Sequence, residues 1–339
     1  MQALDRIIER AKASPKRIVL PEGFDSRIIQ AAARIHKEGI ADPILLGESE
    51  QIMRRAEKVG VDVSHIEIIN PANSDMLLEF GELVYQLRKT KGIDRKQANE
   101  LAKTPLWFGN LLVKTDYADG SVSGAVHSTA NVVRTAIRAL GVRSDAKMVS
   151  SFFLMVFDQP HHETLRGSAL FADCALIVEP TAEQMAEIAL ATANNARVLL
   201  EDDPRVAMLS FSTSGSARHP KVSKVQQATD IVKDRDATIQ VDGEIQFHAA
   251  VQPKIAKHKV IDTQVHGRSN VFVFPSLEAG NIAYKMIQLA GGAKAIGPFL
   301  QGLNKTANDL PRSCSVDDIY YTIAATSVLA NKSTPAAIG

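Results

Sequence analysis

The chain has 339 residues, 45% of them hydrophobic and 23% charged, so it can bury a sizeable core and differs in composition from disordered or fibrous proteins. Its 39 basic and 38 acidic side chains nearly cancel, which argues against a broad surface for nucleic acid or an anionic membrane. Two cysteines, Cys174 and Cys314, are too few for a disulfide framework or a zinc cluster and fit free thiols in a reducing compartment.

The first predicted element is an amphipathic, charged helix over residues 1–10, which lacks the apolar stretch of a signal peptide. We therefore expect a cytoplasmic protein. No run of about 18 apolar residues occurs, so the sequence predicts no membrane span. Residues 17–20 then predict a strand and residues 25–37 a helix with one apolar face that ends near Gly39.

Further short, apolar runs alternate along the chain with longer segments of helical period. The predicted strands are residues 43–46, 66–69, 120–124, 148–157, 175–178, 206–212, 238–241, 270–274 and 295–301. The predicted helices are residues 74–91, 128–140, 181–194, 220–233, 278–289 and 315–331. This alternation is typical of α/β proteins with mainly parallel sheets.

The length favours two α/β/α domains that share one cleft. Counting strands places the boundary near Lys147, so that residues 1–147 and 302–339 form the first domain and residues 148–301 the second. No internal repeat or low-complexity segment interrupts this division.

Residues 119–130 form a strand, a loop of small residues and a helix start, an arrangement that presents backbone N–H groups and hydroxyls to an anion. Ser128 and Thr129 begin the helix, and Arg134 lies about two turns further on, where a guanidinium can reach a phosphate. An ordinary capped helix with a surface arginine is an equally good interpretation of this pattern.

A second loop of this kind spans residues 210–220 and is rich in hydroxyls. Ser212, Ser214 and Gly215 are its candidate anion contacts. The sequence contains neither a dinucleotide-binding glycine pattern nor a Walker-type loop. The adjacent His161 and His162 lack the spacing of a metal site, so no metal is expected.

Residues 301–318 predict a polar loop, which contains Asn304, before the last helix. Ser315 is placed as the N-cap of that helix, with Asp317 and Asp318 in its first turn. Because acidic residues stabilise a helix N-terminus without any catalysis, the pattern alone leaves the role of Asp318 open.

Several phrases together resemble the phosphate acetyltransferase family, and the likeness extends over nearly the whole chain. The phrases that carry it are Leu20-Pro21-Glu22-Gly23, Val122-Ser123-Gly124-Ala125-Val126-His127-Ser128-Thr129, Asp242-Gly243-Glu244, Glu278-Ala279-Gly280-Asn281-Ile282-Ala283-Tyr284-Lys285 and Cys314-Ser315-Val316-Asp317-Asp318-Ile319. The resemblance implies two α/β domains like those of isocitrate and isopropylmalate dehydrogenases, with the active-site cleft between them. It also implies a homodimer and the reversible transfer of an acetyl group between coenzyme A and inorganic phosphate.

The resemblance further implies roles for particular residues. Arg88 and Arg134 match arginines that bind coenzyme A, while Arg312 and Asp318 match catalytic residues, the arginine holding the phosphate and the aspartate accepting the thiol proton. Tyr284, in a matching segment, and Asn304, in the polar loop before the last helix, are expected to contact substrate along with Ser128, Thr129, Ser212, Ser214 and Gly215. No cofactor is implied, because coenzyme A, acetyl-CoA, acetyl phosphate and phosphate are substrates.

Two positions depart from the family pattern. Pro311 occupies the place of a serine and offers neither a hydroxyl nor a backbone N–H. Leu289 stands where the family has another arginine that contacts substrate. Three rival functions therefore stay open: a phosphate acyltransferase for butyryl or longer groups, a catalytically weakened acyl-CoA-binding regulatory module, and a metal-dependent dehydrogenase. The dehydrogenase would need clustered aspartates and a nicotinamide site, and the sequence shows neither pattern.

Overall fold

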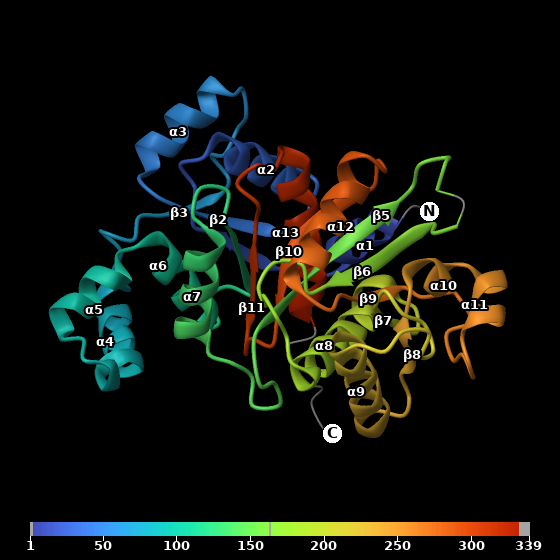
Figure 1. Ribbon diagram of the computed structural model, residues 1–339. Coiled ribbons are helices and arrows are strands. Elements are labelled where there is room, and N and C mark those ends of the chain that lie inside the picture. The colour runs from blue at the N-terminus through green and yellow to red at the C-terminus, as the bar shows by residue number, and fades with distance from the viewer. Residues whose placement is uncertain (1–2, 163, 332–339) are drawn as a thin grey trace, which may run out of the picture. The chain divides into compact units, whose positions relative to one another are not determined.

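The computed structural model describes residues 3–162 and 164–331 and divides into two compact units (Figure 1). One unit comprises Asp5–Ser144 and residues 303–331, and the other comprises Asp145–Gly302 together with Ala3 and Leu4 at the start of the described chain. The chain thus leaves the first unit once and returns to it with its last strand and helix.

The sheet of the first unit is entirely parallel, with strand order β11-β4-β1-β2-β3. Its strands are β1 (Arg17–Leu20), β2 (Asp42–Leu46), β3 (Glu67–Ile69), β4 (Gly120–Ser123) and β11 (Thr306–Asp309). Because all strands point the same way, the residues that follow β1, β4 and β11 meet at one edge of the sheet. Polar residues of three distant segments therefore converge there.

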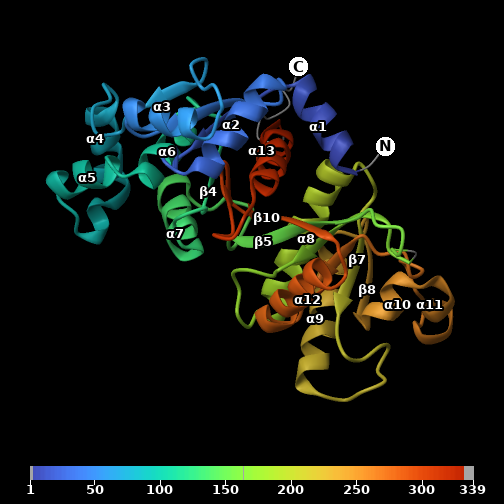
Figure 2. The ribbon, with the colours of Figure 1, turned by 90° about the horizontal axis from the view of Figure 1, so that it is seen from above.

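The helices of this unit are α1 (Ala3–Ala13), α2 (Ser26–Lys37), α3 (Ser49–Lys58), α4 (Leu77–Arg88), the 3-10 helix η1 (Lys89–Lys91), α5 (Arg95–Ala102), α6 (Pro105–Lys114), α7 (Thr129–Leu140) and α13 (Val316–Ala330). Helices α2 and α13 pack against each other and against β2, β4 and β11, whereas α6 and α7 form the other layer (Figure 2).

The second unit has a six-stranded sheet of order β10-β5-β6-β9-β7-β8, in which only the pairs β10/β5 and β5/β6 are antiparallel. Its strands are β5 (Ser150–Phe157), β6 (Gly167–Ala172), β7 (Arg205–Leu209), β8 (Gln240–Ile245), β9 (Val271–Val273) and β10 (Lys294–Gln301). Its helices are α8 (Ala182–Leu200), α9 (Pro220–Arg235), α10 (Phe247–Val251), α11 (Pro253–Lys259) and α12 (Leu277–Leu289).

The predicted α/β class with mainly parallel sheets is confirmed, but the strand predicted over residues 175–178 is wrong. Those residues form bends. The buried carboxylate of Asp173 accepts hydrogen bonds from the backbone N–H groups of Ala175, Leu176 and Ile177, at 2.8, 3.1 and 3.2 Å. Because a side chain takes these donors, they are not available to a neighbouring strand.

Residues 301–318, predicted as one polar loop, contain the short strand β11, which pairs in parallel with β4. Its central residues are buried, including the polar Asn308 and Asp309. Among the described residues, no helix has the length and apolar character needed to cross a membrane.

Candidate active site

A buried carboxylate organises the loop between β4 and α7. Glu22 follows β1, is fully buried, and accepts hydrogen bonds from the backbone N–H groups of Gly124, Ala125, Val126 and His127, at 2.8 to 2.9 Å. Burial alone would raise the pKa of Glu22, but the hydrogen bonds from His127, Val126 and Gly124 outweigh it and lower the pKa. The side chain is therefore an anion held inside the protein.

This arrangement corrects one expectation about the loop. The N–H groups of Gly124 to His127 are not free to bind an external anion, because Glu22 already occupies the concave surface that they form. The groups that stay available begin with Ser128, whose hydroxyl oxygen caps α7 by accepting from the N–H of Asn131. The sequence could not show this, since Glu22 lies about 100 residues from the loop.

Gly124 is required where the loop crosses the end of β11. Its φ is +121°, and a Cβ at this position would lie 2.5 Å from the carbonyl oxygen of Leu310 and 2.3 Å from Oδ1 of Asp309. Only glycine allows the two segments this close approach.

Arg27 ties the same loop to the segment after β11. Its guanidinium is fixed by Asp25, the N-cap of α2, at 2.9 and 3.0 Å. From there it donates to the carbonyl oxygen of Ala125 at 2.8 Å and to those of Arg312 and Cys314 at 2.8 and 2.9 Å. The loop that precedes Ser128 and the segment that carries the predicted catalytic pair are thus joined by one side chain.

The predicted catalytic pair lies on the second of these loops. Arg312 is exposed, and its guanidinium has no hydrogen-bond partner among the residues that the structure describes. Asp318 is the third residue of α13 and forms a capping box with Ser315: its Oδ2 accepts from the N–H and the hydroxyl of Ser315, both at 2.8 Å. The predicted N-cap at Ser315 is confirmed, and one oxygen of Asp318 remains for other chemistry.

Pro311 fits its position without loss of a backbone hydrogen bond. Its carbonyl oxygen accepts from the N–H of Cys314 at 2.9 Å, which closes the turn that contains Arg312. Since this position supplies only a carbonyl to the turn, proline satisfies the backbone, and what it lacks is the hydroxyl of a serine.

Thr129, another predicted contact, is engaged inside the protein. Its hydroxyl donates to Oδ2 of the fully buried Asp309 at 2.7 Å. Burial raises the pKa of Asp309 to about 7, and the negative charge of Glu22 adds to the rise. Asp309 was not among the residues predicted from the sequence. The signal that could have identified it is a polar pair, Asn308 and Asp309, at the end of a strand.

We expect Asp309 to make the stability of the protein depend on pH. Because its folded pKa is raised above the unfolded value of 3.8, the folded protein binds this proton more tightly, and stability is lost as pH rises between about 4 and 7. Asp309→Asn removes this loss of stability, which amounts to about 1.4 kcal/mol for each unit by which the folded pKa exceeds the unfolded one. Urea unfolding at pH 5 and pH 8 should show the variant gaining stability relative to wild type at pH 8. An equal difference at both values would contradict the assignment.

Three arginines from two helices gather at another place in this unit. Arg88 ends α4, and Arg134 and Arg138 lie one turn apart on α7. Slight desolvation together with the positive charges of Arg88 and Arg134 lowers the pKa of Arg138. Arg134 also donates to Oδ1 of Asn131 at 3.4 Å. The structure thus brings together the two predicted arginines, Arg88 and Arg134, and adds Arg138 to them. The sequence could have indicated Arg138, because it follows Arg134 by four residues and so lies on the same helix face.

Asn304 has a structural role. Its side-chain amide donates to the carbonyl oxygens of Leu140 and Val142, at 3.0 and 3.3 Å, and so ties the end of α7 to the segment before β11. Its predicted contact with substrate stays a prediction.

The loop over residues 210–220, in the second unit, repeats the pattern found at Glu22. The carboxylate of Glu244 accepts from the hydroxyl of the buried Ser212 and from the N–H of Gly215, both at 2.8 Å. The hydroxyl oxygen of Ser214 accepts from the N–H of Ile261 at 3.1 Å. The expectation that this loop offers free hydrogen-bond donors to an anion is therefore wrong here too. The substrate contacts predicted for Ser212, Ser214 and Gly215 stay predictions.

Tyr284 and Leu289 both belong to α12, but their surroundings differ. Tyr284 is buried in the core, with its ring stacked on Phe153 at a centroid distance of 4.2 Å, and its predicted substrate contact stays a prediction. Leu289 is 83% exposed at the end of the helix.

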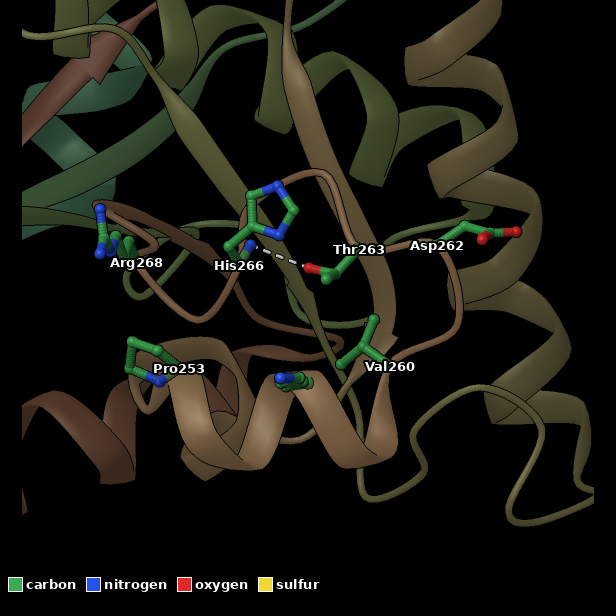
Figure 3. A pocket seen from close by; sticks show the side chains of 7 residues that line it. Pro253, Val260, Asp262, Thr263, His266 and Arg268 are labelled. Carbon is green, nitrogen blue, oxygen red and sulfur yellow. Dashed lines mark hydrogen bonds between the residues drawn. The ribbon is translucent and has the colours of Figure 1, made fainter.

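Two hollows of the second unit lie away from these residues. A pocket of about 620 Å³ is lined by Pro253, Lys257, Val260, Asp262, Thr263, His266 and Arg268, none of which was a predicted site residue (Figure 3). A second pocket, of about 590 Å³, includes Arg218, His219 and Lys224 at the start of α9. Among the described residues, no group of three or more histidine, cysteine, aspartate or glutamate side chains is placed to hold a metal ion.

Comparison with known proteins gives a consistent result. The family model described as phosphate acetyl/butaryl transferase matches residues 2–327. The chain is 47% identical to the phosphate acetyltransferase of Thermoanaerobacterium thermosaccharolyticum, over 97% of this chain and 100% of that protein, and 42% identical to that of Acetivibrio thermocellus, over 97% and 98%. It is also similar to the solved structure of a phosphotransacetylase from Streptococcus pyogenes, with a TM-score of 0.90 and 40% identity over 97% of this chain and 98% of that one.

Proposed function

The chain belongs to the phosphate acetyl/butaryl transferase family and is a phosphate acetyltransferase, and we propose that Arg312 and Asp318 carry the chemistry of its acetyl transfer. Its substrates are acetyl-CoA and phosphate in one direction and coenzyme A and acetyl phosphate in the other. The observation that supports the pair most is that both groups lie on one short turn and helix start, with the guanidinium and one carboxylate oxygen left without protein partners among the described residues.

In the proposed mechanism, Asp318 accepts the proton of the coenzyme A thiol, directly or through water. Arg312 holds the phosphate of acetyl phosphate and offsets its negative charge. The thiolate then attacks the carbonyl carbon, a C–S bond forms, and the C–O bond to phosphate breaks. A free thiol has a pKa of about 8.5, so lowering it by two units requires about 2.7 kcal/mol of favourable interaction.

Direct transfer in a ternary complex is favoured over an acyl-enzyme on cysteine. Burial raises the pKa of Cys314 to about 11 and raises the pKa of Cys174 well above its usual range. Both thiols are therefore poor nucleophiles near neutral pH. Labelled coenzyme A should not exchange into acetyl-CoA in the absence of phosphate, and rapid exchange without phosphate would contradict direct transfer.

The preferred acyl group is proposed to be acetyl. Initial rates of thioester loss with phosphate and either acetyl-CoA or butyryl-CoA measure this directly. Faster turnover of acetyl-CoA supports the proposal, whereas faster turnover of butyryl-CoA supports a longer-chain phosphate acyltransferase.

We assign coenzyme A binding to Arg88, Arg134 and Arg138. Arg134→Ala and Arg138→Ala should each raise the KM for coenzyme A about tenfold or more, because a charge-assisted phosphate contact contributes about 1.5 to 3 kcal/mol. The effect should weaken as salt is raised. Arg95→Ala is the matched control, since this exposed arginine is already paired with Glu82 at 3.0 Å. An unchanged KM in both variants would contradict the assignment.

We further propose a cytoplasmic homodimer. Two buried, unpaired cysteines fit a reducing compartment. Ile282, Met286 and Leu289 form an exposed apolar stripe on α12 at helical spacing, and such a stripe is typical of an association surface. Sedimentation velocity measures the assembly state.

The second candidate function, an acyl-CoA-binding regulatory module, is favoured by Pro311 and by the exposed Leu289. The two functions differ in one measurable property: a regulatory module binds acetyl-CoA without turning it over.

A further inference from the structure

His127 is held by the same buried carboxylate that organises its loop. Its ring Nδ1 lies 2.7 Å from Oε1 of Glu22, and its backbone N–H donates to the same oxygen at 2.8 Å. The ring is 28% exposed, whereas the carboxylate is fully buried. Among the described residues, Nε2 has no hydrogen-bond partner. The structure thus fixes one ring nitrogen inside the protein and leaves the other for a ligand.

The partner determines which nitrogen carries a proton. The hydrogen bonds from the loop lower the pKa of Glu22, so this carboxylate is ionised and can only accept, and Nδ1 must be the donor. The ring can act as an acid only as the imidazolium, in which Nε2 carries a second proton while Nδ1–H donates to the buried carboxylate at 2.7 Å. A carboxylate that orients a histidine in this way is a recurrent arrangement in acid–base catalysis.

The reaction needs such a proton donor at the leaving group. When the thiolate displaces phosphate from the dianion of acetyl phosphate, the electron pair of the broken C–O bond goes to the bridging oxygen. Without a proton, phosphate would leave as a trianion, a much stronger base than hydrogen phosphate. Neither proposed role of Arg312 or Asp318 supplies this proton, since the guanidinium stays protonated and the carboxylate accepts the thiol proton.

We propose that His127 is the general acid of the reaction and protonates the departing phosphate through Nε2, an inference that rests on the proposed acetyl transfer. The C–S bond forms, the C–O bond breaks, and the Nε2 proton passes to the bridging oxygen, so that hydrogen phosphate leaves. Nδ1–H remains on Glu22 throughout. The thiol proton held by Asp318 returns through solvent to the neutral imidazole and completes the cycle.

The charged groups around the dyad come from three further segments. Arg27 of α2 binds the carbonyl oxygen of Ala125, two residues before His127. Asp309 at the end of β11 interacts electrostatically with Glu22. Cys314 interacts with Glu22, with Arg27 and with Asp318, so the dyad and the proposed base belong to one electrostatic cluster.

The test is His127→Asn, because the asparagine amide can take the place of Nδ1–H against Glu22 while nothing replaces Nε2. We expect kcat for acetyl phosphate and coenzyme A to fall about 10²-fold or more. The KM values and the calorimetric affinity for coenzyme A should change by less than about threefold. The dependence of wild-type activity on pH that a general acid imposes should be absent from the variant. His65→Asn, an exposed histidine of the same unit, is the control.

Two results would overturn the inference. A His127→Asn variant with nearly wild-type kcat and an unchanged pH profile would leave His127 a structural residue. A fall in kcat matched by lower thermal stability or weaker coenzyme A binding would also reject the acid role. His127→Gln is a second variant whose side chain fills the site but cannot donate a proton as an acid, so its kcat should be as low as that of His127→Asn. If wild type itself shows no turnover, the proposed function fails before this question arises.

Discussion

Replacing Arg312 with alanine is expected to lower kcat about 10³-fold and to leave the fold intact. The guanidinium is exposed and without a protein partner among the described residues, so its removal costs no internal contact. Its backbone position is fixed independently, because Arg27 donates to the Arg312 carbonyl oxygen at 2.8 Å. What is lost is the cation that offsets charge on the phosphate in the transition state, and removing one such electrostatic contact costs about 10²- to 10³-fold.

The companion variant is Asp318→Asn, which removes the proposed base and keeps an oxygen for the capping box with Ser315. Asp317→Asn is its matched control, because Asp317 lies in the same helical turn but is exposed and paired with Arg34 at 2.8 Å. Steady-state kinetics of thioester formation measure all three variants. Activity of Arg312→Ala within about tenfold of wild type would show that another group holds the phosphate.

Glu22→Gln is expected to lower the free energy of unfolding by about 3 kcal/mol or more. Glu22 accepts four backbone hydrogen bonds and one from the His127 ring while fully buried. Glutamine has one acceptor oxygen, and its amide would point N–H groups at the N–H groups of the loop. The loop that begins α7 should therefore loosen, and catalysis should fall with it.

Urea unfolding of Glu22→Gln beside Glu50→Gln measures the effect. Glu50 is an exposed partner of Arg54 at a spacing of four residues and should contribute about 0.5 kcal/mol or less. If the two variants lose the same stability, Glu22 does not organise the loop as the structure indicates.

The parts of the fold that could be predicted well are those with strong local signals. The N-caps of α2, α7, α8 and α13 are Asp25, Ser128, Thr181 and Ser315, and each accepts a backbone N–H with its side chain. The amphipathic helices α2 and α7 were likewise predicted, whereas the equally amphipathic α3 was not. Helix α6 was missed because residues 106–113 are buried on all sides and show no polar face.

The site was predictable in its residue types but not in its internal partners. Both loops of small residues were candidate anion sites, and no local pattern indicated that Glu22 and Glu244 fill them from another segment of the chain. Long-range pairing of this kind has no local signal, whereas Arg134 and Arg138 share a helix face that spacing alone reveals. No role was predicted for His127, because the buried carboxylate beside it comes from a distant segment of the chain.

The most direct test of the proposed function is coenzyme A-dependent consumption of acetyl phosphate by the purified protein, followed as thioester absorbance. We expect sustained turnover with one phosphate released per thioester formed, even though Pro311 replaces the serine of the family pattern. Measurable binding of acetyl-CoA without turnover would contradict this expectation and would identify the chain as an acyl-CoA-binding regulatory protein.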